Sequence, residues 1–193
     1  MAKNVYAVGF VAFIVIMIAF FVTNIFFRDV NYYRTSIVLN AFLVPLVLAI
    51  GAFFSVTTYS RYKKEISFKE AFGRAFLPMF VGGLLSVLSI FIYISYVDKD
   101  TKDLLNYQYI ESYQRSLEEE YSKANQITKP NSPEMQDLEK NYKEAKIRIK
   151  AKEDKKEDMF SLQYFAYVFA GFCAFFIILS VFFGSFFRTR RAE

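Results

Sequence analysis

The sequence contains no histidine, no tryptophan and a single cysteine among its 193 residues. Without histidine, neither a Ser-His-Asp nor a Cys-His catalytic arrangement can form. Transition-metal sites built on histidine or on several cysteines are effectively excluded as well. Cys173 alone cannot form a disulfide within the chain, so cysteine usage indicates no redox compartment. We therefore predict a protein that is not an enzyme, with no catalytic residue, no cofactor and no bound metal.

Charge is also missing from four long stretches of the chain. These stretches are strongly apolar, because 54% of all residues are hydrophobic and 24 are Phe. Roughly 20 apolar residues suffice to cross a hydrocarbon core of about 30 Å. We predict four transmembrane helices rather than an apolar soluble bundle. The first stretch exceeds the signal-peptide core of about 7–15 residues, and no A-x-A-like site follows it, so we expect an uncleaved helix. The charge-free windows are Asn4–Phe27, Thr35–Ser60, Ala75–Val97 and Met159–Phe187, and the expected helices are about 5–27, 36–58, 72–97 and 159–187.

The basic residues between these windows predict how the chain is oriented, because short loops rich in Lys and Arg stay in the cytoplasm. Nine basic residues fall on the side of the two termini, and only Arg28 and Arg34 lie in the loop after the first window. We therefore expect an inner-membrane, multi-pass protein with both termini cytoplasmic. The nine are Lys3 near the N-terminus, Arg61, Lys63, Lys64, Lys69 and Arg74 after the second window, and Arg188, Arg190 and Arg191 in the tail.

Residues 98–158 are then expected in the periplasm. This segment holds 13 basic and 15 acidic residues, and long segments translocate largely regardless of charge. A basic inner face also fits binding of anionic lipid or nucleic acid. We interpret it as a topology signal, with the lipid bilayer and no nucleic acid as partner.

Local motifs predict how the helices begin and pack. Ser67 and Glu70 fit a capping box, in which the Ser67 hydroxyl accepts from the Glu70 N–H and the Glu70 carboxylate accepts from the Ser67 N–H. Such a box starts a helix at Phe68. Asn40 is expected to form an interhelical hydrogen bond. Small residues allow close helix approach, and they occur at Gly82, Gly83 and Ser86 and, every four residues, at Ala166, Ala170 and Ala174.

Residues 98–158 are predicted to form an antiparallel helical hairpin, with a turn near Pro130 and a second helix capped by Ser132. Each half carries a narrow apolar stripe at spacings of 3 and 4, which is typical of a coiled coil. Each half is only two to three heptads long, which is short for a coiled coil. Two interpretations stay open: the hairpin pairs only with itself, or it docks on another protein or a second copy. The predicted seam is Ile110, Tyr113, Leu117 and Tyr121 in the first half and Met135, Leu138, Tyr142, Ala145 and Ile149 in the second.

The stretch "YSRYKKEISFKEAFGRAFLPMFVGGLLSVLSIFIYI" at residues 59–94 resembles a bacterial four-helix membrane family known as domain of unknown function 4199, common in Bacteroidota. The resemblance rests on an "ISF-x-x-AF" entry into the third helix, here Ile66 to Phe72. A charged helical insert at Glu111–Lys156 and a basic tail at Arg188–Arg191 follow the same layout. The insert departs from the family in its two prolines. The resemblance implies an inner-membrane location and no particular activity.

These inferences combine into one expected architecture. The fold class is an all-α membrane protein, with three transmembrane helices in residues 1–97, an extramembrane hairpin at 98–158, and a fourth helix and tail at 159–193. We expect it to act without catalysis, by associating with a membrane or periplasmic protein or with itself. The alternative is a small transporter or channel subunit. The windows contain no ionisable residue at depth, which ion pathways usually need. A membrane enzyme ranks third.

Overall fold

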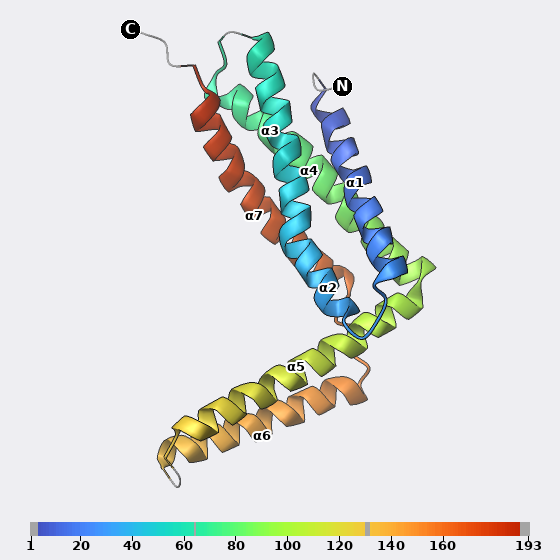
Figure 1. The fold of residues 1–193 in the computed structure, drawn as a ribbon, viewed down its shortest axis with the longest axis vertical. Helices are drawn as coiled ribbons and strands as arrows, with labels where there is room; N and C mark the ends of the chain where they lie inside the picture. The colour runs from blue at the N-terminus through green and yellow to red at the C-terminus, as the bar shows by residue number, and fades with distance from the viewer. Residues whose placement is uncertain (1–3, 64, 130–131, 190–193) are drawn as a thin grey trace. The chain divides into compact units, whose positions relative to one another are not determined.

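The computed structural model describes residues 4–63, 65–129 and 132–189, and every regular element in these ranges is a helix. The chain divides into two compact units. One unit, Met1–Lys99 with Leu162–Glu193, is called the bundle here, and the other, Asp100–Ser161, is called the α5/α6 unit. Figure 1 labels the helices: α1 (Val5–Phe26), α2 (Tyr32–Val38), α3 (Val44–Tyr62), α4 (Phe68–Ile92), α5 (Lys99–Ile127), α6 (Pro133–Asp154) and α7 (Leu162–Phe187).

The bundle contains four helices that are long and apolar enough to cross a membrane, as predicted. They are Val5–Phe26, Tyr32–Tyr62, Phe68–Val97 and Leu162–Phe187. The second span joins α2 to α3 through the π-helical turn η1 (Leu39–Leu43), and the third extends α4 through a second π-helical turn, η2 (Tyr93–Val97). The first of these turns immediately precedes the start of α3, where Pro45 has no N–H to donate to the carbonyl four residues earlier.

Helix α4 is the centre of the bundle, because α1, α3 and α7 all pack against it (Figure 1). Glycines permit two of these contacts. A Cβ on Gly82 would lie 2.8 Å from the backbone oxygen of Gly9 in α1, and one on Gly83 would lie 2.8 Å from the ring of Phe176 in α7. The predicted close approach at Gly82 and Gly83 is therefore present. The surrounding core is built from Ala12, Ile16, Leu48, Ala52, Ala75 and Met79.

Two packing predictions need correction. Ala166, Ala170 and Ala174 are all exposed, so this row of small residues makes no helix contact within the described bundle. Small residues at a spacing of four only define a face, and α7 instead turns its bulky Phe176 toward α4. Asn40 donates to the Ser36 carbonyl at 2.9 Å, inside its own helix rather than between helices. A backbone acceptor one turn away satisfies the amide without a partner helix.

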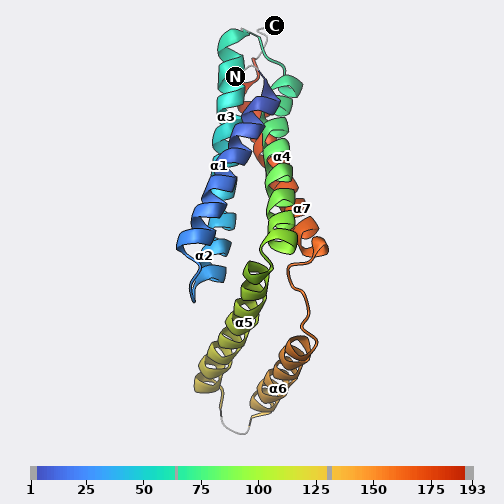
Figure 2. The same cartoon turned by 90° about the vertical axis from the view of Figure 1, so that its right-hand side faces the viewer.

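In the α5/α6 unit the two helices run alongside each other and meet through long side chains rather than through close backbone approach (Figures 1 and 2). Ser132 caps α6 by accepting from the Met135 N–H, with Pro133 at the first helical position. Helix α6 ends at Asp154, and Lys156 then adopts a left-handed backbone conformation with φ of 48°. That conformation stops the helix in the way a terminal glycine usually does.

Candidate functional site

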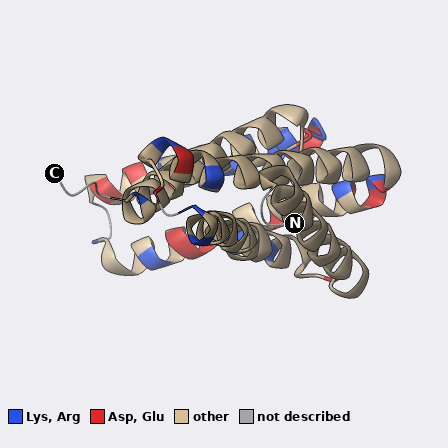
Figure 3. Ribbon diagram, turned by 90° about the horizontal axis from the view of Figure 1, so that it is seen from above, with Lys and Arg blue, Asp and Glu red and all other residues tan. Residues whose placement is uncertain are grey.

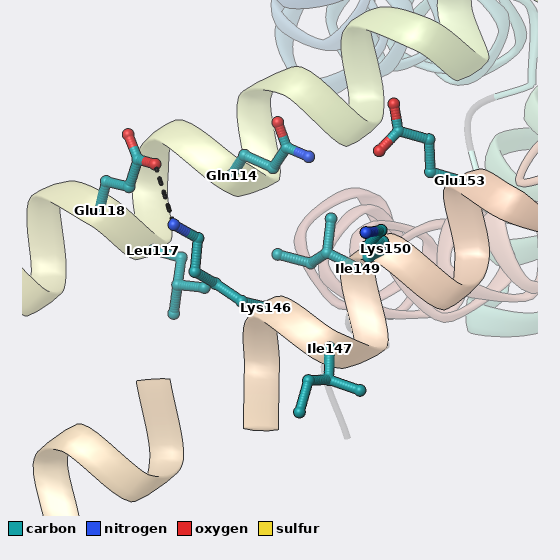
Figure 4. Close-up of a pocket in the computed structure, with 8 residues that line it drawn as sticks. All are labelled: Gln114, Leu117, Glu118, Lys146, Ile147, Ile149, Lys150 and Glu153. Atoms are coloured by element: carbon teal, nitrogen blue, oxygen red, sulfur yellow. Dashed lines mark ion pairs between the residues drawn. The ribbon is translucent and has the colours of Figure 1, made fainter. Parts of the chain in front are cut away.

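The first candidate site is the groove between α5 and α6, with a volume of about 420 Å³. An aromatic stack and an ion pair join these two helices. The rings of Tyr121 and Tyr142 lie 4.1 Å apart at 20°, and the Lys146 ammonium lies 3.9 Å from the Glu118 carboxylate. Figure 4 shows the lining residues from α5 (Gln114, Leu117 and Glu118) and from α6 (Lys146, Ile147, Ile149, Lys150 and Glu153).

The predicted seam matches α6 more closely than α5. In α6, Ile149 is buried and Met135, Leu138, Tyr142 and Ala145 are half-buried. In α5, Ile110, Leu117 and Tyr121 are half-buried, but Tyr113 is 51% exposed and Gln114 lines the groove instead. Both positions follow Ile110 by about one helical turn. The helix repeat of 3.6 residues places position 114 on the same side as Tyr121, and position 113 away from it.

Asp158 connects the segment after α6 to the first turns of α5. Its carboxylate lies 2.6 Å from the Lys102 ammonium and accepts from the Asn106 side chain at 3.3 Å and from the Phe160 N–H at 3.0 Å. Partial burial raises the pKa of this carboxyl, but the hydrogen bonds from Lys102, Asn106 and Phe160 outweigh it, so the pKa lies below its ordinary value. Asp158 is therefore ionised at neutral pH.

Four large apolar side chains among the described residues of the α5/α6 unit are exposed to solvent. Tyr107, Tyr113, Ile127 and Ile147 are 65%, 51%, 83% and 68% exposed. Figure 4 shows Ile147 pointing away from α5, while Ile149 points toward the groove. The apolar residues have charged neighbours, including Glu118, Lys146 and Lys150. The surface of this unit can therefore make both apolar contacts and ion pairs.

The second candidate site is a polar cluster at the end of the bundle where α1 stops and α2 starts. The Asp98 carboxylate accepts from Asn24 and pairs with the Arg28 guanidinium, each at 3.3 Å. The buried Tyr32 hydroxyl donates to the Asn24 side-chain oxygen at 3.0 Å. This cluster was missed from the sequence, although one signal was available: Arg28 and Asp98 are the first charges after two charge-free windows.

The third candidate site lies at the opposite end of the bundle, where α3 and α4 are joined. Both hydrogen bonds of the capping box between Ser67 and Glu70 are present at the start of α4. Glu70 also pairs with Lys63 and accepts from the Tyr59 hydroxyl at 3.3 Å. The hydrogen bond to Glu70 raises the pKa of Lys63 above its ordinary value. The Arg74 guanidinium lies 4.0 Å above the Tyr59 ring, which gives a cation–π contact.

The tail after α7 is hydrogen-bonded to the loop between α3 and α4. The Thr189 N–H donates to the Ile66 carbonyl at 2.9 Å, and the Ile66 N–H donates to the Thr189 hydroxyl at 3.1 Å. Arg61, Lys69 and Arg188 lie around this junction and are exposed. Figure 3 shows the basic and acidic positions viewed from this end. Four other predicted topology residues, Lys3, Lys64, Arg190 and Arg191, lie outside the described residues.

The described parts of the chain hold no group of three or more His, Cys, Asp or Glu residues that could bind a metal ion. Cys173 is half-buried within α7. The contacts observed at the three sites are ion pairs, hydrogen bonds and apolar or aromatic contacts.

Comparison with known proteins identifies a family for this chain but no individual relative. Neither the curated proteins nor the solved structures that were searched include a match to this sequence. A family model described as "Protein of unknown function (DUF4199)" matches residues 8–189. That match covers the α5/α6 unit and all four candidate membrane spans apart from the first three residues of the first span, so the chain belongs to the DUF4199 family.

Proposed function

We propose that this chain is a non-enzymatic integral protein of a bacterial inner membrane that acts by associating with another protein. The contact surface is the α5/α6 unit, an antiparallel hairpin outside the membrane on the periplasmic side. The observation that carries the proposal is the exposure of Tyr113 and Ile147 on a unit that is otherwise highly charged.

Two physical arguments support a protein as the ligand of this surface. Tyrosine combines apolar area with a hydroxyl and little conformational freedom, which makes it frequent in interfaces. The groove also holds apolar side chains, Leu117 and Ile149, between the charged groups of Glu118, Lys146 and Glu153. An interface of this kind has an apolar centre and a charged rim, and the charges select the partner.

The orientation follows from the uneven distribution of basic residues, with nine on the side of the termini and two in the loop after the first span. Periplasm-active reporters fused after residue 130 and after the C-terminus test it. We expect activity only from the fusion after residue 130. Activity from the C-terminal fusion would reverse the orientation and move the contact surface to the cytoplasm.

Association is tested by replacing Tyr113 or Ile147, in turn, with a photo-crosslinking amino acid in the full chain in cells. Glu134 serves as the matched control, because it is exposed on the first turn of α6. We expect discrete protein adducts from positions 113 and 147 and none from 134. Equal labelling at all three positions, or no adduct, would remove the α5/α6 unit as the contact surface.

A second candidate function, a small transporter or channel subunit, is favoured by two features of the bundle. Two of its spans contain π-helical turns, η1 and η2, which are frequent at functional sites. Ser55 and Ser180 are fully buried with hydroxyls that have no hydrogen-bond partner among the described residues. Flux or current in reconstituted vesicles, lost in Ser55→Ala with Ser180→Ala or on changing Asn40, would place this function first.

A further inference from the structure

We infer that the junction of the α3–α4 loop and the C-terminal tail binds the phosphate of an anionic phospholipid headgroup. The side chains that contact the phosphate are those of Arg61, Lys69 and Arg188, called the basic triad here. This inference does not depend on the proposed association through α5 and α6, and it does not depend on which side of the membrane the junction faces.

The first step is to separate the cations at this end by what they contact. Lys63 pairs with Glu70, and Arg74 lies over the Tyr59 ring, so both contribute to the fold itself. The three members of the basic triad are exposed, and no acidic side chain in the described ranges forms an ion pair with them. Their charge is therefore available to an external anion.

The second step is position along the membrane normal. Arg61 lies in the last turn of α3, whose span ends at Tyr62. Lys69 is the second residue of α4, and Arg188 directly follows the last residue of α7. All three cations thus lie within two residues of the end of a candidate span. A group at that depth meets lipid headgroups first, which is why a lipid is favoured over a soluble anion.

The third step is that the junction is fixed. Two hydrogen bonds join Thr189 to Ile66, and Ile66 is only 3% exposed. On the α3 side, the Glu70 carboxylate of α4 accepts from the Tyr59 hydroxyl at 3.3 Å and pairs with Lys63. The ends of α3, α4 and α7 are held together by these contacts. The backbone that carries the basic triad is therefore fixed before a phosphate binds, and only side chains lose freedom on binding.

The test is native mass spectrometry of the full-length protein in detergent, titrated with phosphatidylglycerol or with phosphatidylcholine. The test variant is Arg61→Gln with Lys69→Gln and Arg188→Gln. The matched control is Lys123→Gln with Lys129→Gln and Lys140→Gln, which removes the same charge from exposed lysines of the α5/α6 unit. We expect about a fivefold loss of phosphatidylglycerol binding per triad charge, with no loss in the control.

The geometry is tested separately with Thr189→Pro, which removes the donor N–H and the accepting hydroxyl but keeps the triad. We expect the preference for phosphatidylglycerol over phosphatidylcholine to fall several-fold. An unchanged preference in the triple variant, or an equal loss in the control, would overturn the inference. Tighter binding of inorganic phosphate than of phosphatidylglycerol would overturn the lipid as ligand. Should the triple variant fail to fold, Arg188→Gln alone must show its fivefold loss.

Discussion

The bundle and the α5/α6 unit are held together in different ways. In the bundle, α1 and α7 reach α4 where Gly82 and Gly83 allow backbone or a ring to come within van der Waals distance. In the α5/α6 unit, contact depends on long side chains, such as the pair Tyr121 and Tyr142. Close backbone packing tolerates no added atom, whereas contact between long side chains tolerates many. Substitutions that add atoms should therefore destabilise the bundle, and substitutions that remove side-chain atoms should destabilise the α5/α6 unit.

The largest effect is expected for Gly82→Ala. Its new Cβ would meet the Gly9 backbone oxygen at 2.8 Å, and backbone cannot rotate away as a side chain can. We expect a loss of about 1–3 kcal/mol in the free energy of unfolding. Denaturation in detergent, followed by circular dichroism, measures it. Gly73→Ala in the same helix is the control, because nothing lies within 4 Å of a Cβ there. Equal stability of the two variants would contradict the close α1–α4 contact.

A smaller effect is expected for Gly83→Ala, whose Cβ meets the fully buried ring of Phe176 at 2.8 Å. Phe176→Leu should restore part of the loss, with a coupling of about 0.5–3 kcal/mol in a double-mutant cycle. Gly184→Ala is the comparison. Its Cβ meets the Phe68 ring at the same distance, but Phe68 is 40% exposed and can swing outward. Additive effects of Gly83→Ala and Phe176→Leu would show that the α4–α7 contact is not tight.

Features that depend on a few adjacent residues, or on the uniformly apolar environment of a membrane, could be predicted from the sequence. The four spans follow from charge-free windows, because hydrocarbon excludes charge along the whole length of a helix. The capping box follows from Ser67 and Glu70 alone, since its two hydrogen bonds join residues three apart. The α6 stripe follows from the helical repeat.

Features that depend on the partner helix could not be predicted. Gly82 and Gly83 of α4 and the alanine row of α7 have the same small-residue signal, but only the two glycines are at a contact. The choice of Gln114 over Tyr113 in the groove depends on the direction from which α6 approaches. The cluster around Asp98 joins residues more than 60 positions apart, so the sequence could place its members only at the same end of the bundle.

In the α5/α6 unit, the clearest effect is expected on removing a ring of the aromatic stack. Tyr121→Ala should weaken the contact between α5 and α6 by about 0.5–1.5 kcal/mol beyond the lost area. Hydrogen exchange measured by mass spectrometry should then be faster in α5 and α6 and unchanged in α1, α3 and α4. Tyr113→Ala is the control, because that ring is 51% exposed. Slower exchange in either helix, or a larger effect from Tyr113→Ala, would contradict the stack as the main contact.

The smallest effect is expected from protonating Asp158. Because its pKa is lowered in the folded chain, the carboxylate contributes stability above its ordinary pKa of about 3.9, and this contribution is lost as pH falls through the lowered value. The side chain is 42% exposed, so the contribution should be well under about 1 kcal/mol. The chain has no Trp, so Tyr121→Trp gives a single fluorescent reporter in this unit. In that background, Asp158→Asn should change the emission at pH 7, and the difference should shrink as pH falls toward 2, whereas Asp137→Asn should change the emission at neither pH. A difference that persists at pH 2 would mean that Asp158→Asn acts through shape rather than charge.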